Sequence, residues 1–158
     1  MSRTDSIFVL RAQTPEEREA CFAIRHEVFV EEQKVPVEAE LDEHDETALH
    51  FLALKGNQSV GAARVIFKNG GLIAKIGRVA VLKKARGLGI GRAVMEAIEA
   101  DPRVRQAARL ILHAQTQVLL FYERLGYQAS GDEFMEDGMA HYFMSKDNQK
   151  VLPAARAV

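Results

Sequence analysis

The spacing of hydrophobic residues changes several times in the first third of the chain, and each change predicts a new element. The four-residue apolar run Ile7–Leu10 is typical of a short strand. The sequence TPEE at residues 14–17 places a Thr before a Pro and a Glu, which indicates a capped helix start. The stripe of that helix consists of Cys21, Phe22, Ile24, Val28 and Phe29, at helical spacing.

A polar and strongly acidic stretch, Glu31–Thr47, interrupts the apolar pattern, and we expect a solvated loop there with at most one short helix. Strand-like runs then follow at Leu49–Leu54 and Val60–Phe67, joined by the turn-forming sequence KGNQS. The sequence NGG at residues 69–71 predicts a second hairpin turn, which leads into a long strand, Leu72–Leu82.

The second half of the chain alternates helical and strand-like patterns. A helix that ends before Pro102 is predicted by an apolar stripe of Ile90, Ala93, Val94, Ala97 and Ile98. Leu110–Ala114 is strand-like, and Val118–Leu125 is a further helix that Gly126 can terminate. The closing strands are expected at Tyr127–Ala129 and His141–Met144.

This order of elements predicts the class of the fold. Several consecutive strands precede the first strand–helix–strand crossover, so the sheet should be antiparallel early and parallel near its middle. We therefore expect an α+β fold with α/β/α layers around a mixed sheet of about seven strands. Residues 1–146 are expected to form a single domain, with 147–158 as a frayed tail.

Charge and cysteine content narrow the possible partners. The formal net charge is −1, from 21 basic and 22 acidic residues, so the basic excess typical of binding to nucleic acid or an anionic membrane is absent. The apolar run near the N-terminus is too short for a signal-peptide core or a membrane span. Cys21 is the only cysteine and cannot form an intramolecular disulfide. We therefore expect a cytoplasmic protein.

A glycine-rich turn, ARGLGIGRAV at residues 85–94, lies between the long strand and the next helix. Free N–H groups at such a helix start bind phosphate, and glycines let the backbone approach a diphosphate closely. A dinucleotide-binding fingerprint needs a glycine where Arg92 stands, and no Gly-Lys-Ser/Thr closes the run as a P-loop requires. The pattern Arg-x-x-Gly-x-Gly is complete, with Arg86, Gly89 and Gly91.

That loop resembles the coenzyme A loop of the GNAT superfamily of N-acetyltransferases. A second stretch, LILHAQTQVLLFYERLGYQ at residues 110–128, resembles the strand and helix that follow in the family, including its Phe-Tyr-x-x-x-Gly-Tyr pattern. Within the superfamily, IRHEVFVEEQKVP, ELDEHD, LHAQTQ and EDGMAH resemble the small ElaA-like branch. The resemblance covers residues 7–144 and implies a GNAT fold and an enzyme that uses acetyl-CoA.

The resemblance also implies roles for particular residues. Coenzyme A contacts are expected at Val79, Ala80, Val81, Arg86, Gly87, Leu88, Gly89, Ile90, Gly91, Arg92, Gln115 and Phe121. Tyr122 is expected to protonate the departing thiolate as general acid. An acceptor amine must also lose a proton, and the candidate bases are Glu32 and His113, with Asp42 and His141 as further possibilities.

The acceptor site is less defined by the sequence. Phe29, Arg78 and His141 are candidate substrate-binding residues, and Arg78 suits a salt bridge equally well. The acidic stretch favours a cationic acceptor, such as a polyamine, an amino sugar or a lysine side chain. We expect a small-molecule amine acceptor and no metal, because nothing sets ligand geometry around His44, Asp45 and His50. A homodimer is plausible by analogy.

Three other interpretations stay open. Arg25, Phe29, Glu40, Asp42 and Asp45 resemble the N-terminal pattern of acyl-homoserine-lactone synthases, although the tryptophan of that pattern is missing and the chain has no Trp. The chain could bind acyl-CoA without turnover, or its loop could bind phosphate without preferring coenzyme A. Gly77 inside the long strand predicts a bulge or bend that would splay the strand from its neighbour and admit the thioester.

Overall fold

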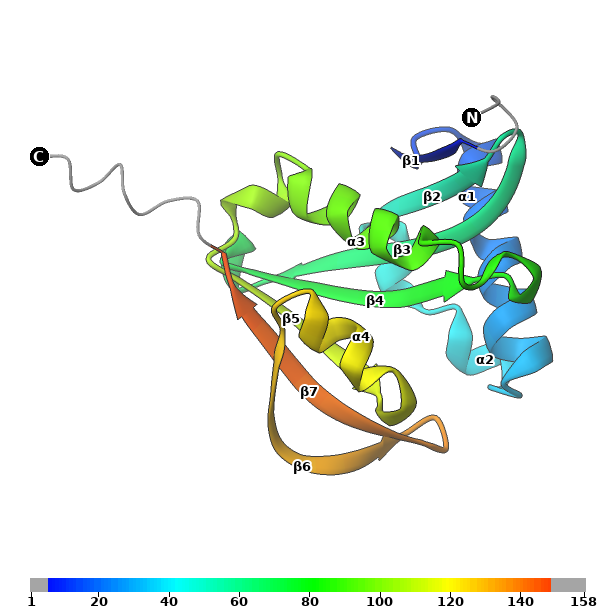
Figure 1. Cartoon of the computed structure of the whole chain (residues 1–158). Coiled ribbons are helices and arrows are strands. Elements are labelled where there is room, and N and C mark those ends of the chain that lie inside the picture. The colour runs from blue at the N-terminus through cyan, green and yellow to red at the C-terminus, as the bar shows by residue number, and fades with distance from the viewer. Residues whose placement is uncertain (1–5, 149–158) are drawn as a thin grey trace, which may run out of the picture. The chain divides into compact units, whose positions relative to one another are not determined.

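The strands form one mixed sheet in the computed structural model, which describes residues 6–148 (Figure 1). Within these residues the sheet has seven strands in the order β1-β2-β3-β4-β5-β7-β6. The pairs β1–β2, β2–β3, β5–β7 and β6–β7 are antiparallel, whereas β4 and β5 are parallel. The predicted mixed sheet flanked by helices is confirmed. The predicted frayed end falls largely on residues 149–158, outside the described residues.

The chain divides into two compact units. Among the described residues, the first unit comprises residues 6–66 together with Gly77–Glu99, and the second comprises Phe67–Ile76 and residues 100–148. Strand β4, Ile73–Val81, therefore begins in the second unit and ends in the first. Within residues 6–148, no helix combines the length and apolar character that crossing a membrane would require.

The first unit opens with a strand and a capped helix. β1, Ile7–Arg11, pairs with β2, Leu49–Lys55, which pairs with β3, Gln58–Lys68. α1, Pro15–Arg25, begins where the Thr14 side chain accepts a hydrogen bond from the Glu17 N–H, and the Glu17 carboxylate accepts one from the Thr14 N–H. The capping box read from TPEE is thus formed.

The acidic segment is more ordered than the sequence predicts. The α1 helix continues as a π-helical segment, His26–Glu32, and is followed by α2, Val37–Glu40, and a 3₁₀ turn, Glu43–Glu46. Glu40 and Asp45 are buried, with 4% and 8% of their surface exposed, so the expectation of a solvated loop is wrong for them. A buried carboxylate needs a partner, and both have one, as described below.

Close packing of a helix start against β3 in the first unit explains why that strand carries a glycine. Cys21, Ile24 and Val28 pack with buried residues of the strands, among them Leu52, Ala62 and Ala80. α3, Ile90–Ala100, begins directly over β3, because a Cβ added at Gly61 would lie 3.1 Å from Ile90 Cγ2 and 3.2 Å from Ala53 Cβ. Gly61 therefore lets the start of α3 approach the sheet closely.

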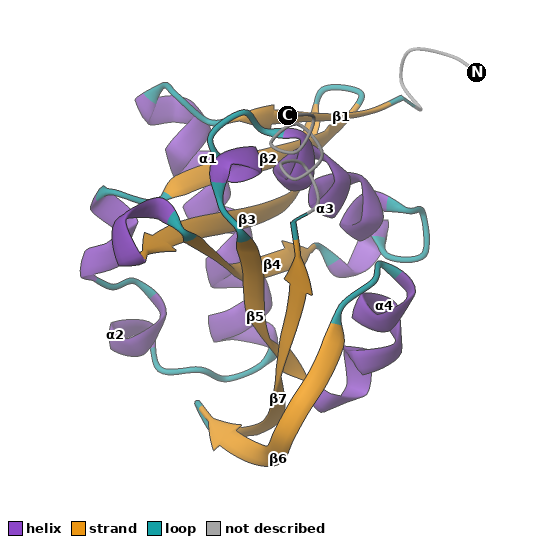
Figure 2. Cartoon of the chain, turned by 90° about the vertical axis from the view of Figure 1, so that its left-hand side faces the viewer, coloured by secondary structure: helices purple, strands orange, loops and turns teal. Residues whose placement is uncertain are grey.

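The second unit is built on a three-strand segment beside a short helix, as Figure 2 shows. Its elements are β5, Arg109–Gln115; α4, Leu119–Arg124; β6, Gln128–Glu136; and β7, Met139–Asp147. The closing strands are longer than predicted, and they join at the turn Asp137–Gly138. β6 is exposed along most of its length and carries few apolar residues, so the alternation of apolar and polar residues did not reveal how far the strand extends beyond Ala129. Beyond β7, the Asn148 N–H donates to the Ala108 carbonyl at 2.9 Å.

Candidate active site

The glycine-rich loop joins β4 to α3 in the first unit and opens a helix N-terminus. Gly87 and Gly89 have φ angles of 81° and 83°, in the left-handed region that favours glycine, and a Cβ at either would meet nothing within 4 Å. The Ala93 N–H donates to the Gly89 carbonyl at 3.0 Å and makes the first α-helical turn. The N–H groups of Ile90, Gly91 and Arg92 precede that bond and are available to an anion.

The Arg86 guanidinium binds a carboxylate of the acidic segment, that of Glu32. Its Nη1 and Nη2 each donate to Glu32 at 2.7 Å, and its Nε donates to the Val81 carbonyl at 3.0 Å. Hydrogen bonding to Arg86 lowers the pKa of Glu32 below its ordinary value, and the same contact raises the pKa of Arg86. The arginine of the Arg-x-x-Gly-x-Gly pattern therefore links the glycine-rich loop to Glu32, which lies 54 residues earlier in the chain.

The other basic residues of the loop are arranged differently. Arg92 Nε pairs with Glu96 at 3.2 Å along the surface of α3, whereas Lys83 and Lys84 are exposed just before the loop. Such exposed charges attract anions over a distance of about a Debye length. Positive potential at the loop thus comes from the helix N-terminus and the lysines more than from Arg86.

The strand before the loop has an irregular backbone angle one residue later than the predicted bulge or bend at Gly77. Gly77 does not have a positive φ angle, whereas the next residue, Arg78, has a φ angle of 52°. Non-glycine residues in this region are strained and persist only where other contacts hold them. The pairing of β4 with β5 comprises Ile73–Ile76 and Arg109–Leu112, so it includes no residue of Val79–Val81.

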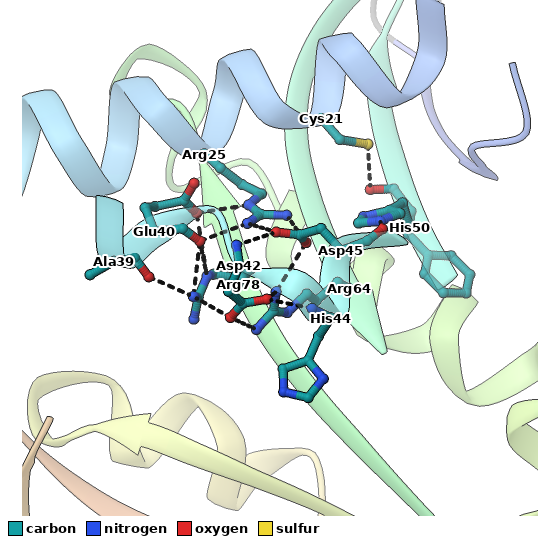
Figure 3. Close-up of polar contacts among 11 residues, drawn as sticks. Cys21, Arg25, Ala39, Glu40, Asp42, His44, Asp45, His50, Arg64 and Arg78 are labelled. Carbon is teal, nitrogen blue, oxygen red and sulfur yellow. Dashed lines mark hydrogen bonds and ion pairs between the residues drawn. The ribbon is translucent and has the colours of Figure 1, made fainter. Parts of the chain in front are cut away.

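Side chains from four segments of the first unit form a buried ion network (Figure 3). Arg25 Nε donates to Glu40 at 2.8 Å, and Arg25 Nη1 donates to Asp45 at 2.7 Å. Arg64 of β3 pairs through Nη1 with Asp42 at 2.7 Å and with Asp45 at 3.0 Å. The hydrogen bonds from Arg25 and Arg64 hold the pKa of Asp45 well below its ordinary value, against the opposing effect of burial.

Arg78 joins this network from β4. Its Nη2 donates to the Glu40 carbonyl at 2.9 Å and to Asp42 Oδ2 at 3.3 Å, while Nε donates to the Glu40 carbonyl at 3.1 Å. Burial, together with the charges of Arg64 and Arg25, lowers the pKa of Arg78. These bonds hold its strained backbone in place, and they tie residues 39–42 to the strand that leads into the glycine-rich loop.

The buried side chains of His50 and Cys21 have surroundings that shift their pKa values. His50 Nε2 lies 2.9 Å from the Asp45 carbonyl and donates to it, so Nδ1 carries the lone pair, and burial lowers the pKa of this histidine. His50 Nδ1 and Arg64 Nε are buried without a hydrogen-bond partner. Cys21 Sγ donates to the Phe51 carbonyl at 3.4 Å, and burial raises the pKa of its thiol to about 12, which makes it a poor nucleophile.

The candidate residues of the second unit fall in two places. On α4, Tyr122 is 8% exposed, burial raises its pKa, and its ring packs edge-on against Phe121 and Tyr127. A raised pKa keeps the phenol protonated, as a general acid requires. On β5, His113 Nδ1 lies 2.9 Å from Glu136 Oε1, and Gln115 accepts a bond from Gln117 Nε2 at 2.7 Å.

The remaining substrate candidates have structural contacts as well. Phe29 packs against the core of the first unit. His141 is 5% exposed, and its Nδ1 lies 2.8 Å from the Met139 carbonyl. Within residues 6–148, no group of three or more His, Cys, Asp or Glu side chains is placed to hold a metal ion.

The structure adds functional candidates that sequence reasoning missed. Arg64 pairs with Asp42 and Asp45, and the only signal in the sequence is an arginine within the apolar strand GAARVIF. Glu136 pairs with His113 across 23 residues, for which the sequence holds no signal. Because Glu32, Glu40, Asp42 and Asp45 are all paired with arginines, the acidic stretch offers a cationic acceptor fewer free carboxylates than its composition indicates.

Comparisons with known proteins agree on one family. A family model described as "Acetyltransferase (GNAT) domain" matches residues 11–148. The Bacillus subtilis protein YjcF, described as an uncharacterised N-acetyltransferase, is 39% identical over 137 residues, which is 86% of this chain and 96% of YjcF.

Two solved structures extend this similarity to the fold. An acyl-CoA N-acyltransferase from Pseudomonas aeruginosa is 31% identical with a TM-score of 0.78, over 89% of this chain and 99% of that one. Escherichia coli ElaA is 27% identical with a TM-score of 0.77, over 90% and 99% of the two chains.

Proposed function

The chain belongs to the GNAT acetyltransferase family and is an acyl-CoA N-acyltransferase, and from this premise we propose that it transfers an acetyl group from acetyl-CoA to a primary amine. The acceptor is a small molecule, with a protein lysine or N-terminus as the alternative acceptor. The amine attacks the thioester directly while both substrates are bound. Residues 1–146 act as one acyltransferase domain, a proposal supported by a family match that spans both units.

One observation carries the proposal, namely the backbone of the loop between β4 and α3. Gly87 and Gly89 have left-handed φ angles and open space at the position of a Cβ, beside the free N–H groups of a helix start. A diphosphate fits this arrangement, since it needs close approach to the backbone and several N–H donors. Coenzyme A is the diphosphate-containing ligand that the family uses.

The pantetheine arm is proposed to lie along Val79–Val81. The pairing of β4 with β5 ends at Ile76, which supports a role for the following backbone groups in binding a ligand. An N–H in this stretch stabilises the oxyanion that forms when the amine attacks the carbonyl. The new bond joins the amine nitrogen to the carbonyl carbon, and the carbon–sulfur bond breaks.

Two protons must move for the reaction to balance. A base takes one from the attacking amine, and Tyr122 gives one to the departing thiolate, a role that the sequence resemblance assigns. Glu32 and His113 are the candidate bases. Arg86 binds the Glu32 carboxylate and lowers its pKa, so Glu32 accepts a proton less readily than an unpaired glutamate would. Arg78, Phe29 and His141 stay candidates for contact with the acceptor.

The acyl-homoserine-lactone pattern has a structural explanation in this chain. Arg25, Glu40, Asp42 and Asp45 belong to the buried ion network of the first unit, which ties α1 to residues 40–45. In this chain the residues of the pattern therefore hold the acidic segment in place, and they do not by themselves favour a lactone product. The expected cytoplasmic location and a homodimer stay predictions.

Calorimetric titration with acetyl-CoA tests the proposal. We expect micromolar binding by the wild-type protein, about −8 kcal/mol, and loss of binding in Gly89→Asp. Gly70→Asp is the matched control, since Gly70 also has a positive φ angle, 66°, and open space at the Cβ position. Asp tolerates this backbone region better than most residues, so both variants should fold.

The titration is followed by an amine panel in which release of free coenzyme A thiol is measured. Equal loss of affinity in both variants, or none in either, would remove the loop from the binding site. Binding of acetyl-CoA without thiol release for any primary amine would favour the acyl-CoA-binding alternative.

A further inference from the structure

One face of the strands β5, β7 and β6 gathers titratable and aromatic side chains in the second unit. His113 is paired with Phe143 across β5 and β7, and Phe134 is paired with His141 across β6 and β7. Paired residues project to the same side of a sheet, and so do residues two apart along a strand. His113, Phe143, His141, Phe134 and Glu136 therefore share this face.

The carboxylate of Glu136 reaches across β7 to the histidine on β5. Glu136 Oε1 lies 2.9 Å from His113 Nδ1. The hydrogen bond to His113 and the charges of His113, His141 and Lys75 lower the pKa of Glu136, so it is ionised and can only accept. Nδ1 of His113 must then carry the hydrogen and donate it, which leaves the lone pair of the neutral ring on Nε2.

Aromatic neighbours hold the ring that this hydrogen bond orients. The His113 ring packs edge-on against Phe134, with centroids 5.1 Å apart, and is tilted against Phe143 at 6.1 Å. Its side chain nevertheless stays 25% exposed, unlike that of a core histidine. The result is an imidazole fixed on three sides, with part of its surface still accessible.

We infer that Glu136 is a positioning residue that fixes His113 in the tautomer whose Nε2 accepts the proton of the acceptor amine. This inference rests on the proposed amine acetyl transfer and deepens it by choosing between the candidate bases. In the reaction, the amine proton moves to Nε2 as the nitrogen–carbon bond forms. The carboxylate of Glu136 stabilises the resulting imidazolium, which later returns the proton to solvent.

The tautomer can be measured without any substrate. Long-range proton–nitrogen NMR spectra distinguish a protonated from an unprotonated imidazole nitrogen, and the His113 signals are identified by their loss in His113→Gln. We expect Nδ1 protonated and Nε2 unprotonated in the neutral ring of the wild type. In Glu136→Gln, we expect this preference to be reduced or reversed, because an amide can donate to Nδ1 as well as accept from it.

Glu133→Gln is the matched control for these spectra. Glu133 lies on the same strand, carries the same charge and accepts a bond from the Thr116 hydroxyl at 2.8 Å. Its variant should keep the wild-type tautomer and full activity. A wild-type ring protonated at Nε2, or a tautomer that is the same in Glu136→Gln, would overturn the inference.

Turnover gives the second arm of the test. We expect His113→Gln to lower kcat about 100-fold, the smaller end of what a general base contributes. Glu136→Gln should lower it about 10-fold or more with little change in the KM for acetyl-CoA, and Glu136→Asp should recover part of the loss. In the His113→Gln background, Glu136→Gln should have no further effect, because Glu136 acts only through the histidine.

The two arms separate failure of the inference from failure of the proposed function. Additive losses in the double variant, or full activity in His113→Gln, would overturn the inference while amine acetylation stands. If the wild type acetylates no amine, the proposed function fails, and the NMR spectra alone decide whether Glu136 fixes the histidine.

Discussion

Glu32 shows at the residue scale how a contact distinguishes two roles that the same side chain could have. As a general base it would need a free carboxylate, whereas the structure gives it two 2.7 Å bonds to Arg86. Both side chains are more than a third exposed, so the pair contributes about 0.2–1 kcal/mol to stability. Its larger effect is on charge, because it neutralises an arginine of the glycine-rich loop.

Glu32→Gln tests these roles directly. We expect kcat to stay within about threefold of the wild type. If Glu32 were the general base, its replacement would lower kcat about 100-fold or more. Affinity for acetyl-CoA should be equal or higher, since a negative charge near the diphosphate is removed. Steady-state kinetics and calorimetry measure both quantities. Glu31→Gln, at the neighbouring exposed carboxylate, is the control. A 100-fold loss of kcat in Glu32→Gln alone would make Glu32 the base.

At the scale of elements, the close approach of α3 to β3 depends on a single missing side chain. A Cβ at Gly61 would have Ile90 Cγ2, Ala53 Cβ and the Ala80 carbonyl oxygen within 3.1–3.3 Å. Ile90 is the first residue of α3, so crowding at Gly61 would displace the helix start that the glycine-rich loop leads into.

We expect Gly61→Val to lower the free energy of unfolding by about 1–3 kcal/mol through overpacking. Affinity for acetyl-CoA should fall as well, because the N–H groups of the helix start would shift. Gly77→Val is the matched strand control, since a Cβ there meets nothing within 4 Å and φ is not positive. Denaturant titration and calorimetry provide the measurements. Equal stability of the two variants would mean that α3 does not depend on close contact at Gly61.

At the scale of the whole molecule, the buried ion network makes stability depend on pH. Asp42 and Asp45 have pKa values below their ordinary value of 3.8, because Arg64 and Arg25 bond their ionised forms. A depressed folded-state pKa contributes stability that is present above the unfolded pKa and is lost as pH falls through the folded pKa. The protein should therefore lose stability progressively below about pH 4.

Asp45→Asn tests the role of the network in this pH dependence. We expect it to lower the free energy of unfolding at pH 7 by about 3 kcal/mol, since Arg25 loses a buried partner. Between pH 5 and pH 3 its stability should fall less steeply than that of the wild type, because one depressed carboxyl group is gone. Asp132→Asn, at an exposed carboxyl group, is the control. Identical pH slopes for wild type and Asp45→Asn would show that the network does not cause acid unfolding.

Local chemistry explains what could be predicted from the sequence of this protein. The capping box at Thr14, the hairpin strands β2 and β3 and the amphipathic α3 follow from neighbouring residues, and all three are present. The left-handed glycines of the loop follow in the same way, since only glycine adopts such angles freely. Of the exposed strand β6, only the start was predicted, because the residues after Ala129 show no alternation of apolar and polar side chains.

By itself, the amino-acid sequence determined the order of elements, the glycine-rich loop and the family to which the chain belongs. Only the tertiary structure decided which charges meet. The partners Arg25–Asp45, Arg86–Glu32 and His113–Glu136 are 20, 54 and 23 residues apart, and no local spacing encodes such pairs. The packing of strands and helices brings these partners together, and for a buried pair such as Arg25–Asp45 the contact is required because desolvation makes an unpaired buried charge costly.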